Sequence, residues 1–370
     1  MKKIVFIVSS PLTIKAFLSP FIKALAIENE VHIIANFSER EIYDFIPKRV
    51  TLHAVSLERN PNILVDMFAL FSICKLIRKH KFNIVHTFTP KAGLIGQVSA
   101  FLTGVRFRFH TFTGQVWATK KGPFRFVLRL FDKLIGVLAS FSLVDSPSQR
   151  EFLIKNNVLS SEKSAVLGKG SISGINLEKF KYSEDRALNI RAKLNLKNNE
   201  FVYLYAGRLK VDKGIPELFT AFDLVSKNTN SVLVIVGVDE DNLLQYINNS
   251  QIIFCGFAND ITSFFSMADL LCLPSHREGF GNVILEAAAC GLPSLATNIY
   301  GLTDAIIDGE TGMLHEVNDV SSLASHMNKL QDNKEELHRL GNNARARVRA
   351  DFSEEFILGS FLDFYKSNTL

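Results

Sequence analysis

Short apolar runs alternate with helix-length segments along the whole chain. The runs of the first half are IVFIVSS, VHIIAN, TLHAVSL, NIVHTFT, RFRFHTFT and FSLVDS, and those of the second half are FVYLYAG, SVLVIVGV, IIFCGF, DLLCLPS and PSLAT. Such a pattern is typical of parallel sheets with helices on both faces. It predicts an α/β protein with two doubly wound, Rossmann-like domains. Because open sheets bind ligands at the carboxyl ends of their strands, two such domains facing a cleft would bring a donor and an acceptor together.

A glycine- and serine-rich stretch, Leu167 to Phe180, interrupts the pattern and marks the expected domain boundary. We expect one domain over residues 1–168 and a second over residues 169–350. After Glu316 the sequence is mostly helical. The segment FSEEFILGSFLDFYKS, within residues 351–370, predicts a last helix that crosses back onto the first domain.

The stretch from Ser275 to Thr297 combines a glycine loop with a helix. Gly279 and Gly281 break the chain after an apolar run, and Asn282 is the expected N-cap of a helix over Val283 to Cys290. A helix that begins behind a glycine loop offers unpaired N–H groups and a positive dipole end. The stretch therefore predicts a binding site for phosphate.

Two glutamates, Glu278 and Glu286, flank this loop. Glu286 lies four residues after Asn282, so its side chain returns toward the start of the helix. A carboxylate beside a bound phosphate would repel it, so hydroxyl groups are the better ligands for Glu286. The spacing indicates a ligand with phosphate in the middle and a sugar on both sides. An ordinary solvated pair of glutamates around a strand-to-helix turn is the alternative.

The segment AGRLKVDKG, Ala206 to Gly214, directly follows the first strand of the second half. Arg208 and Lys213 flank a loop at the carboxyl end of that strand, where two cations can bind a diphosphate. The alternative is a pair of solvated surface cations before a helix.

Composition limits the classes of protein that remain. With 370 residues, 47% hydrophobic and 21% charged, the chain is long enough for two globular domains. The longest apolar run, Leu134 to Val144, is too short to cross a bilayer, and IVFIVSS lacks a convincing cleavage site for a signal peptide. We therefore expect a cytoplasmic protein. Its four cysteines, Cys74, Cys255, Cys272 and Cys290, form no CxxC pair, which favours buried reduced thiols over disulfides or zinc ligands.

The second half resembles the retaining GT-B glycosyltransferases of family GT4. That family carries a Gly-Arg-(x)4-Lys-Gly loop and a Glu-(x)7-Glu signature, and this chain matches both through most of residues 200–320. The resemblance implies that Arg208 and Lys213 bind the nucleotide diphosphate next to Gly207. It also implies that Glu278 binds the donor sugar, Glu286 the ribose, and the backbone of Phe280 and Gly281, beside Asn282, the distal phosphate.

The first half is similar to the branch of this family that builds bacterial surface polysaccharides, such as O-antigen and capsule repeat units, on lipid carriers. FHTFTG resembles the family's Phe-His-Thr segment and makes His110 a predicted contact of the donor sugar, or else a strand histidine bound to the backbone. Lys91, just inside a predicted helix start at Thr89, is expected either to bind a phosphate of the acceptor or to lie exposed.

The resemblance implies transfer of a sugar, with retention, from a nucleotide donor to a hydroxyl of a lipid-linked glycan, without a cofactor. UDP with an N-acetylhexosamine or a deoxy-amino sugar is the implied donor. Two positions depart from the family. Ser9 to Phe17 replaces a glycine-rich loop, which puts the first domain's backbone contact to the donor in doubt, and Asn176 stands where the family usually has Asp.

Charge divides the chain unevenly. Residues 1–165 carry 23 basic and 11 acidic residues, a net of +12, and the remainder carries −7, since the whole chain is +5. In KKGPFRFVLRLFDKLIGVL, Lys120 to Leu138, cations alternate with Phe and Leu, which favours a helix lying on anionic lipid over a nucleic-acid site. We expect peripheral attachment to the inner face of the cytoplasmic membrane. Packing of these apolar residues in the core is the alternative.

Two further alternatives concern the chemistry. The sequence DED, Asp239 to Asp241, follows a predicted strand and has a form that can hold Mg²⁺ or Mn²⁺ against a diphosphate. Because Arg208 and Lys213 already supply positive charge, we expect no essential metal. A nucleotide-sugar 2-epimerase shares the architecture, but the Glu-(x)7-Glu match argues against it.

Overall fold

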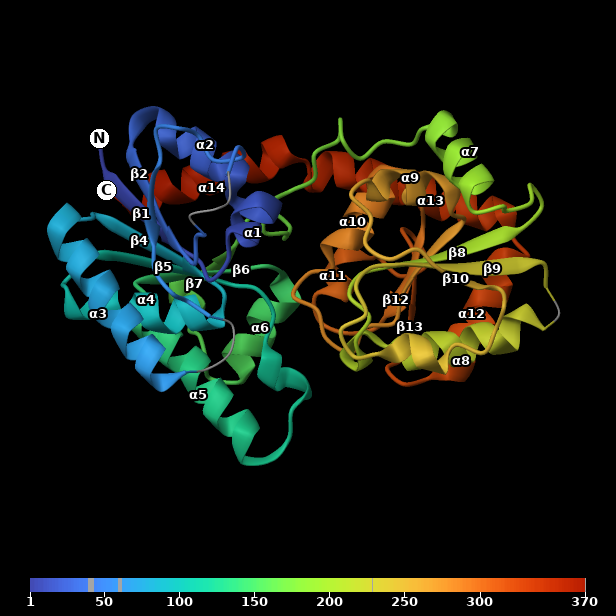
Figure 1. The fold of residues 1–370 in the computed structure, drawn as a ribbon, viewed down its shortest axis with the longest axis horizontal. Helices are drawn as coiled ribbons and strands as arrows, with labels where there is room; N and C mark the ends of the chain where they lie inside the picture. The colour runs from blue at the N-terminus through green and yellow to red at the C-terminus, as the bar shows by residue number, and fades with distance from the viewer. Residues whose placement is uncertain (39–42, 59–61, 228, 370) are drawn as a thin grey trace. The chain divides into compact units, whose positions relative to one another are not determined.

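The computed structural model describes residues 1–38, 43–58, 62–227 and 229–369. The chain divides into two compact units (Figure 1). Unit 1 comprises Met1–Gly174 together with Glu354–Leu370, and unit 2 comprises Ile175–Ser353. Each unit is built around its own parallel sheet, so the structure confirms the predicted α/β class with two Rossmann-like folds.

Unit 1 contains a seven-stranded sheet in the order β3-β2-β1-β4-β5-β6-β7. Its strands are β1 (Lys3–Ile7), β2 (Glu30–Ala35), β3 (Thr51–Ala54), β4 (Ile84–Phe88), β5 (Phe107–Phe112), β6 (Phe141–Val144) and β7 (Ser164–Val166). All neighbours pair in parallel, and the strand order reverses between β1 and β4. Every predicted run of the first half forms a strand, and β7 is an additional one.

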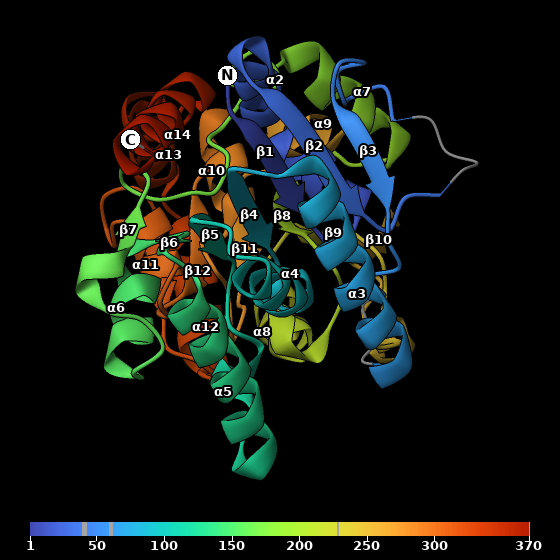
Figure 2. The ribbon, with the colours of Figure 1, turned by 90° about the vertical axis from the view of Figure 1, so that its left-hand side faces the viewer.

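Helices cover both faces of this sheet. They are α1 (Pro11–Thr13), the π-helical turn η1 (Ile14–Leu18), α2 (Ser19–Glu28), α3 (Ile63–His80), α4 (Pro90–Leu102), η2 (Val116–Thr119), α5 (Gly122–Leu138), α6 (Pro147–Lys155), η3 (Ser161–Lys163) and α14 (Glu354–Asn368). Figures 1 and 2 show α2 and α14 on one face and α3, α4 and α5 on the other. Side chains along β1 point alternately to the two faces of the sheet. Phe6 packs in the core that contains residues of α2 and α14, whereas Val5 and Ile7 pack in the core that contains residues of α3 and α4.

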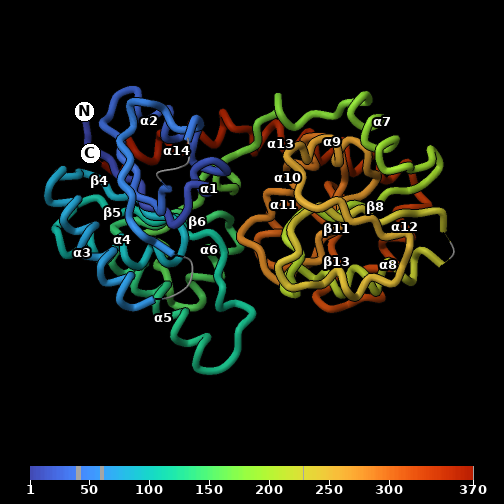
Figure 3. Tube along the Cα trace, in the orientation of Figure 1, coloured from blue at the N-terminus to red at the C-terminus, as the bar shows by residue number. Residues whose placement is uncertain are grey.

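Helix α14 packs on unit 1 although it is the last element of the chain (Figure 3). Phe361 stacks on Phe21 of α2, with ring centroids 4.2 Å apart. The hydroxyl of Tyr365 lies 2.8 Å from Nδ1 of His86 on β4. The helix therefore supplies aromatic side chains to the core that α2 shares with the sheet.

Unit 2 contains a six-stranded parallel sheet in the order β10-β9-β8-β11-β12-β13. Its strands are β8 (Phe201–Ala206), β9 (Ser231–Val236), β10 (Ile252–Phe254), β11 (Leu270–Leu273), β12 (Ser294–Thr297) and β13 (Met313–His315). The helices are α7 (Glu184–Lys193), η4 (Val211–Lys213), α8 (Ile215–Ser226), η5 (Leu243–Tyr246), α9 (Ile261–Met267), α10 (Asn282–Ala289), α11 (Leu302–Ala305), α12 (Val320–Gln331) and α13 (Lys334–Asp351). The strand order reverses between β8 and β11.

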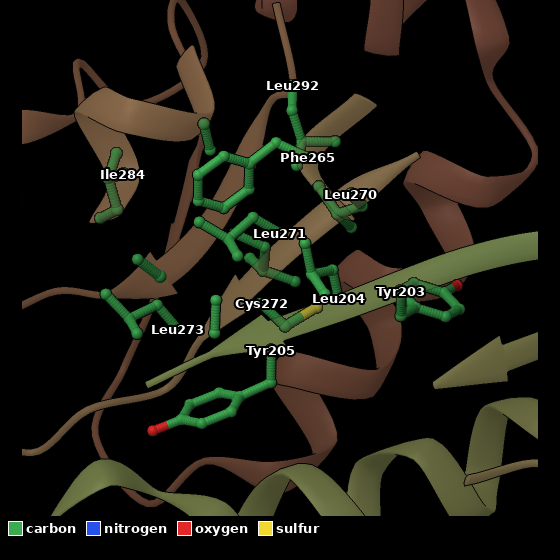
Figure 4. Close-up of a cluster of buried hydrophobic side chains, with 14 of the residues drawn as sticks. Tyr203, Leu204, Tyr205, Phe265, Leu270, Leu271, Cys272, Leu273, Ile284 and Leu292 are labelled. Atoms are coloured by element: carbon green, nitrogen blue, oxygen red, sulfur yellow. The ribbon is translucent and has the colours of Figure 1, made fainter. Parts of the chain in front are cut away.

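Successive residues of β8 point to opposite faces of the sheet, as Figure 4 shows. Leu204 lies on the same side as Leu271 and Phe265, whereas Tyr205 lies on the other side of the strand. All four side chains are buried, which fixes the register of β8 and the direction in which its loop leaves the sheet.

Among the described residues, no helix is long and apolar enough to span a bilayer. The four cysteines are all free thiols. Cys272 and Cys290 are buried as predicted, whereas Cys74 and Cys255 are only half-buried, so the prediction of burial is wrong for these two.

Candidate active site

The loop after β8 carries Arg208 at the carboxyl edge of the sheet. The buried hydroxyl of Tyr205 donates to the carbonyl of Arg208 over 2.8 Å, which anchors the loop to the strand. The guanidinium is 42% exposed, and its Nη1 lies 3.3 Å from both carboxylate oxygens of Glu240, which follows β9. Lys210 contacts the same carboxylate over 3.3 Å. Arg208 is thus accessible from solvent, and a bound anion can replace Glu240 as the partner of its guanidinium.

Lys213 lies at the end of η4, close to the loop that follows β11. Its Nζ contacts Oε1 of Glu278 over 2.6 Å, and Ser275 donates to the same oxygen over 2.9 Å. Gly214 makes this approach possible, since a Cβ there would lie 2.0 Å from the carbonyl oxygen of Pro274, and its φ is +69°. The structure therefore places Lys213 and Glu278 in one site.

The Lys213–Glu278 pair is shielded from water, with side-chain exposures of 14% and 17%. A second ion pair, Arg277 with Asp212 at 3.0 Å, joins the same two loops. Because paired charges in a partly buried setting attract each other more strongly than on an open surface, they fix the relative position of the β8 and β11 loops. Motif spacing alone did not reveal Glu240, Asp212 or Arg277, because their contacts depend on which strands are neighbours.

The start of α10 differs from the prediction in one respect. Gly281, not Asn282, is the N-cap, and Asn282 is the first helical residue. The cap residue has φ +75°, and a Cβ at this position would lie 2.5 Å from Leu302 Cδ2. Glycine adopts this left-handed conformation without the steric cost that asparagine has. The helix still begins behind the glycine loop, at the carboxyl edge of the sheet.

The ring of Phe280 is not accessible to a ligand. The side chain is buried, and its ring centroid lies 5.5 Å from that of Phe352. The loop also packs closely on Gly301, where a Cβ would lie 2.4 Å from the carbonyl oxygen of Gly279. Packing on both sides holds the backbone of Gly279 to Gly281 in place, as a rigid phosphate-binding loop requires.

Glu286 lies one turn into α10 and is half-buried. Within the described chain, no hydrogen bond or ion pair engages its carboxylate. Burial raises the pKa of this carboxyl to about 7, and Lys179 partly opposes the increase. An unpaired, desolvated carboxylate is costly unless a ligand supplies hydrogen-bond donors. The predicted ribose hydroxyls are donors of this kind.

We expect Glu286→Gln to stabilise the fold at about pH 8 by about 1–3 kcal/mol, and to have little effect near pH 5. The raised pKa means that between 4.5 and about 7 the native state binds more protons than the unfolded state. Stability therefore falls as pH rises through this window, and the uncharged glutamine avoids the loss. Urea unfolding at the two pH values measures the difference. Exposed Glu310→Gln serves as control, and an equal effect of Glu286→Gln at both values would contradict the expectation.

The two site residues predicted in the first half lie in unit 1. His110 is buried within β5, where its Nδ1 lies 2.7 Å from the hydroxyl of Thr87. Burial lowers its pKa to about 3, so the imidazole is neutral. A Cβ at Gly93 of α4 would lie 2.4 Å from this ring. Its partner is thus a side chain and not the backbone, and a contact with the donor sugar stays a prediction.

Lys91 lies in the first turn of α4, whose N-cap is Thr89 as predicted. Its Nζ is 2.6 Å from Asp66 Oδ1 on α3, and the side chain is only 16% exposed. The alternative prediction, that Lys91 lies exposed, is therefore wrong. The predicted contact with an acceptor phosphate stays a prediction and requires exchange of the Asp66 partner.

The sequence DED, Asp239 to Asp241, lies in the loop after β9, where its side chains bind backbone N–H groups and basic side chains. Both carboxylate oxygens of Asp239 accept backbone N–H groups, from Leu243 at 2.9 Å and from Leu244 at 3.0 Å. Asp241 accepts the N–H of Val211 over 2.9 Å, and Glu240 pairs with Arg208. Glu240 and Asp241 thus join the loops of β8 and β9, and Asp239 holds the start of η5 in place, so each carboxylate has a structural partner.

Comparison with known proteins identifies the family of this chain. Residues 187–347 match the family described as glycosyl transferases group 1. The chain is 33% identical to the capsular polysaccharide biosynthesis glycosyltransferase CapM of Staphylococcus aureus, over 91% of this chain and 90% of that protein. It is 30% identical to the UDP-Gal:alpha-D-GlcNAc-diphosphoundecaprenol alpha-1,3-galactosyltransferase of Escherichia coli, over 80% and 79% of the two chains.

The fold matches solved structures over nearly its full length. HepE of Anabaena, in complex with UDP and glucose, superimposes with a TM-score of 0.82 at 19% identity, covering 99% of this chain and 100% of that one. The protein therefore belongs to the group 1 glycosyltransferases and has the predicted GT-B fold.

Proposed function

We propose that this glycosyltransferase moves a sugar, with retention of configuration, from a nucleotide-diphosphate donor to a hydroxyl of a lipid-linked glycan during surface polysaccharide synthesis. Two relatives support the pathway and the acceptor class: CapM by its role in capsule biosynthesis, and the galactosyltransferase by its diphosphoundecaprenol-linked substrate. The latter also uses a UDP-sugar. A UDP-N-acetylhexosamine or a UDP-deoxy-amino sugar is the donor that we propose here.

One observation carries the proposal. Where the strand order of unit 2 reverses, Arg208 and Lys213 follow β8, and Glu278 follows β11. Helix α10 begins four residues after Glu278, behind a tightly packed glycine loop. Parallel sheets bind their ligands at such a reversal. Two cations and a helix N-terminus suit a diphosphate, and carboxylates on either side of them suit two sugars.

The proposed reaction breaks the bond between the anomeric carbon and the diphosphate oxygen and forms one to the acceptor oxygen. Negative charge develops on the leaving diphosphate, where Lys213, Arg208 and the backbone N–H groups of α10 stabilise it. The acceptor attacks from the leaving-group side, and its proton passes to the departing phosphate. Glu278 orients Lys213 through its Oε1, and we assign its other oxygen to hydroxyls of the donor sugar.

A panel of donors tests the proposal. Nucleotide release is measured with each UDP-sugar, with and without an undecaprenyl diphosphate-linked sugar as acceptor, and the anomeric configuration of the product is determined by NMR. We expect one donor to be turned over at a rate that depends on the acceptor. Turnover of every donor at the same rate without an acceptor, or an inverted product, would exclude the proposed function.

Activity is expected to survive EDTA, because cationic side chains and a helix terminus already oppose the diphosphate charge. The test is the rate of nucleotide release before and after chelation. Metal catalysis would be established instead if EDTA removed all activity, Mn²⁺ restored it, and Asp239→Ala abolished the activity with Mn²⁺. Asp241→Ala is the matched variant, since it also removes a carboxylate that accepts a backbone N–H in this loop.

Unit 1 offers a surface that suits peripheral contact with anionic lipid. Seven apolar side chains on α5 are 40–66% exposed: Phe124, Phe126, Val127, Leu130, Phe131, Leu134 and Val137. Helix α3, which packs on the same helix α4 as α5 does, exposes Ile63, Leu64, Met67, Phe68 and Phe71. The apolar residues that the sequence predicts to meet lipid are Phe124, Phe126, Leu128, Leu130, Phe131 and Leu134. Of these six, only Leu128 packs against a core, so the core-packing alternative is wrong for the other five. Apolar side chains beside basic ones suit the interface of an anionic membrane.

We expect the combined change of Lys120, Lys121, Arg125 and Arg129 to Glu to lower binding to anionic liposomes about ten-fold or more. Each cation near such a surface is worth about 1 kcal/mol, and salt screens it. Activity on lipid-linked acceptor should fall, while donor binding in solution stays unchanged. The matched control changes the exposed unit 2 residues Lys193, Lys197, Lys227 and Lys329 to Glu, which alters net charge equally. Equal liposome binding by both variants would exclude this membrane site.

A further inference from the structure

Three histidines and a glutamate gather in unit 1 where the strands begin, away from the carboxyl edge that the proposed function uses. Glu30 and His32 are the first and third residues of β2, and His53 is on β3. His80 is the last residue of α3, which returns the chain toward the start of β4. The three imidazole rings lie within 5.2 Å of one another, measured between centroids. Neither the predicted donor site nor the predicted acceptor site includes these residues.

The polar atoms of three of these residues converge. A carboxylate oxygen of Glu30, a ring nitrogen of His32 and a ring nitrogen of His80 all lie within 4.8 Å of one another. His32 is buried, and its Nε2 is 2.9 Å from Oε1 of Glu30. Metal–nitrogen and metal–oxygen bonds of about 2.0–2.2 Å place neighbouring ligand atoms about 3 Å or slightly more apart. Small side-chain movements therefore suffice to form a site.

His53 completes the arrangement from the other side of His32. Its Nε2 lies 2.9 Å from Nδ1 of His32, whereas Nε2 of His32 faces the carboxylate. When Nε2 binds a cation, Nδ1 carries the proton and donates it to His53. Histidine ligands commonly use their second nitrogen in this way, which fixes the tautomer and the direction of the ring.

The carboxylate of Glu30 supplies the negative charge of the cluster. Lys3 contacts the other oxygen of Glu30, Oε2, over 3.1 Å, which leaves Oε1 for the site. The carboxylate is 34% exposed, so an ion can reach it from solvent.

We propose that Glu30, His32 and His80 bind one divalent transition-metal ion of the zinc type, with His53 as a positioning residue. Two imidazoles and one carboxylate are suited to Zn²⁺, Co²⁺ or Ni²⁺ and poorly suited to Mg²⁺ or Ca²⁺. The ion joins the start of β2 to the end of α3 and thereby stabilises unit 1. A purely structural stack of hydrogen-bonded histidines is the competing explanation, and it predicts no metal affinity.

The untagged full-length chain, freed of metal by a chelator, is titrated with Co²⁺ and then with Zn²⁺. We expect visible absorption from bound Co²⁺ to saturate at about one equivalent and to disappear when Zn²⁺ is added. The melting temperature should rise by several degrees with Zn²⁺ and should not change with Mg²⁺. These measurements do not involve catalysis, so their outcome is independent of the glycosyltransferase proposal.

Co²⁺ affinities of single variants test whether the metal binds at this cluster. Glu30→Gln and His80→Gln should each weaken Co²⁺ binding about 10-fold or more, and His53→Gln about 10-fold while one equivalent still binds. His338→Gln, which removes an exposed histidine outside the cluster, should behave like the unmodified chain. Melting curves without metal show whether each variant is folded. No saturable binding by the unmodified chain, or equal affinity in folded His80→Gln, would overturn the proposal.

Discussion

Lys213→Ala is expected to lower the rate of sugar transfer by about 100-fold or more, equivalent to about 3 kcal/mol of transition-state stabilisation. The ammonium of Lys213 lies 2.6 Å from Glu278, in a site where both side chains are largely shielded from water. Without it, Glu278 keeps the hydrogen bond from Ser275 but has no cation beside it, and its charge faces the leaving diphosphate. The variant therefore loses an attraction and gains a repulsion as the bond breaks.

Arg208→Ala should have an effect of similar size for a related reason. Arg208 contacts Glu240 at 3.3 Å through both carboxylate oxygens and is 42% exposed, so a diphosphate can replace Glu240 as its partner. Neither variant should unfold the protein, because both residues lie in the loop between β8 and α8.

Lys210→Ala is the matched control for both variants. It removes one positive charge from the same loop, and its ammonium contacts Glu240 and Asp241. We expect less than about a five-fold change, typical of a partly exposed ion pair. Rates of nucleotide release at saturating donor, together with melting temperatures, separate a catalytic defect from loss of folding. Turnover within a few-fold of normal in Lys213→Ala or Arg208→Ala would remove that residue from the proposed diphosphate site.

The sequence predicts the sheets well because their strands carry strong signals. Runs such as SVLVIVGV and FVYLYAG are buried on both faces, and buried parallel strands consist of continuous β-branched and aromatic residues. Strands β7 and β13 escape prediction because each has only three residues and, unlike the equally short β10 in the run IIFCGF, neither lies in a longer apolar run. The π-helical turn η1 (Ile14–Leu18) is also too short to predict, and it overlaps the segment Ser9 to Phe17 that departs from the family pattern.

The candidate site is predictable only in part. Motif spacing identifies Lys213 and Glu278, since the two loops lie at one edge of the sheet, on the adjacent strands β8 and β11. It does not identify Glu240 as the partner of Arg208, because that contact depends on β9 lying on the other side of β8. It also assigns the helix cap to Asn282 on residue preference, whereas crowding by Leu302 requires a glycine at position 281.

Glu286→Ala and Glu278→Ala are expected to separate binding of the nucleotide from binding of the sugar. Glu286 is the carboxylate without a partner among the described residues, and we propose that it accepts hydrogen bonds from the ribose. Its loss should weaken both UDP and the intact UDP-sugar about 10- to 100-fold, since hydrogen bonds to a charged group contribute about 1.5–3 kcal/mol.

Glu278→Ala should instead impair the intact donor and leave UDP affinity unchanged or higher. UDP lacks the sugar that Glu278 is proposed to bind, and removal of the carboxylate frees Lys213 from a 2.6 Å contact so that it can bind the diphosphate. Isothermal titration calorimetry with UDP and with the UDP-sugar gives four affinities for the two variants. The control Ser275→Ala removes only the hydroxyl that donates to Glu278, and its affinities for UDP and for the UDP-sugar should each differ from those of the unmodified chain by less than about five-fold. If both glutamate variants lost UDP equally, the two carboxylates would act on the same part of the ligand and the proposed division between ribose and sugar would be wrong.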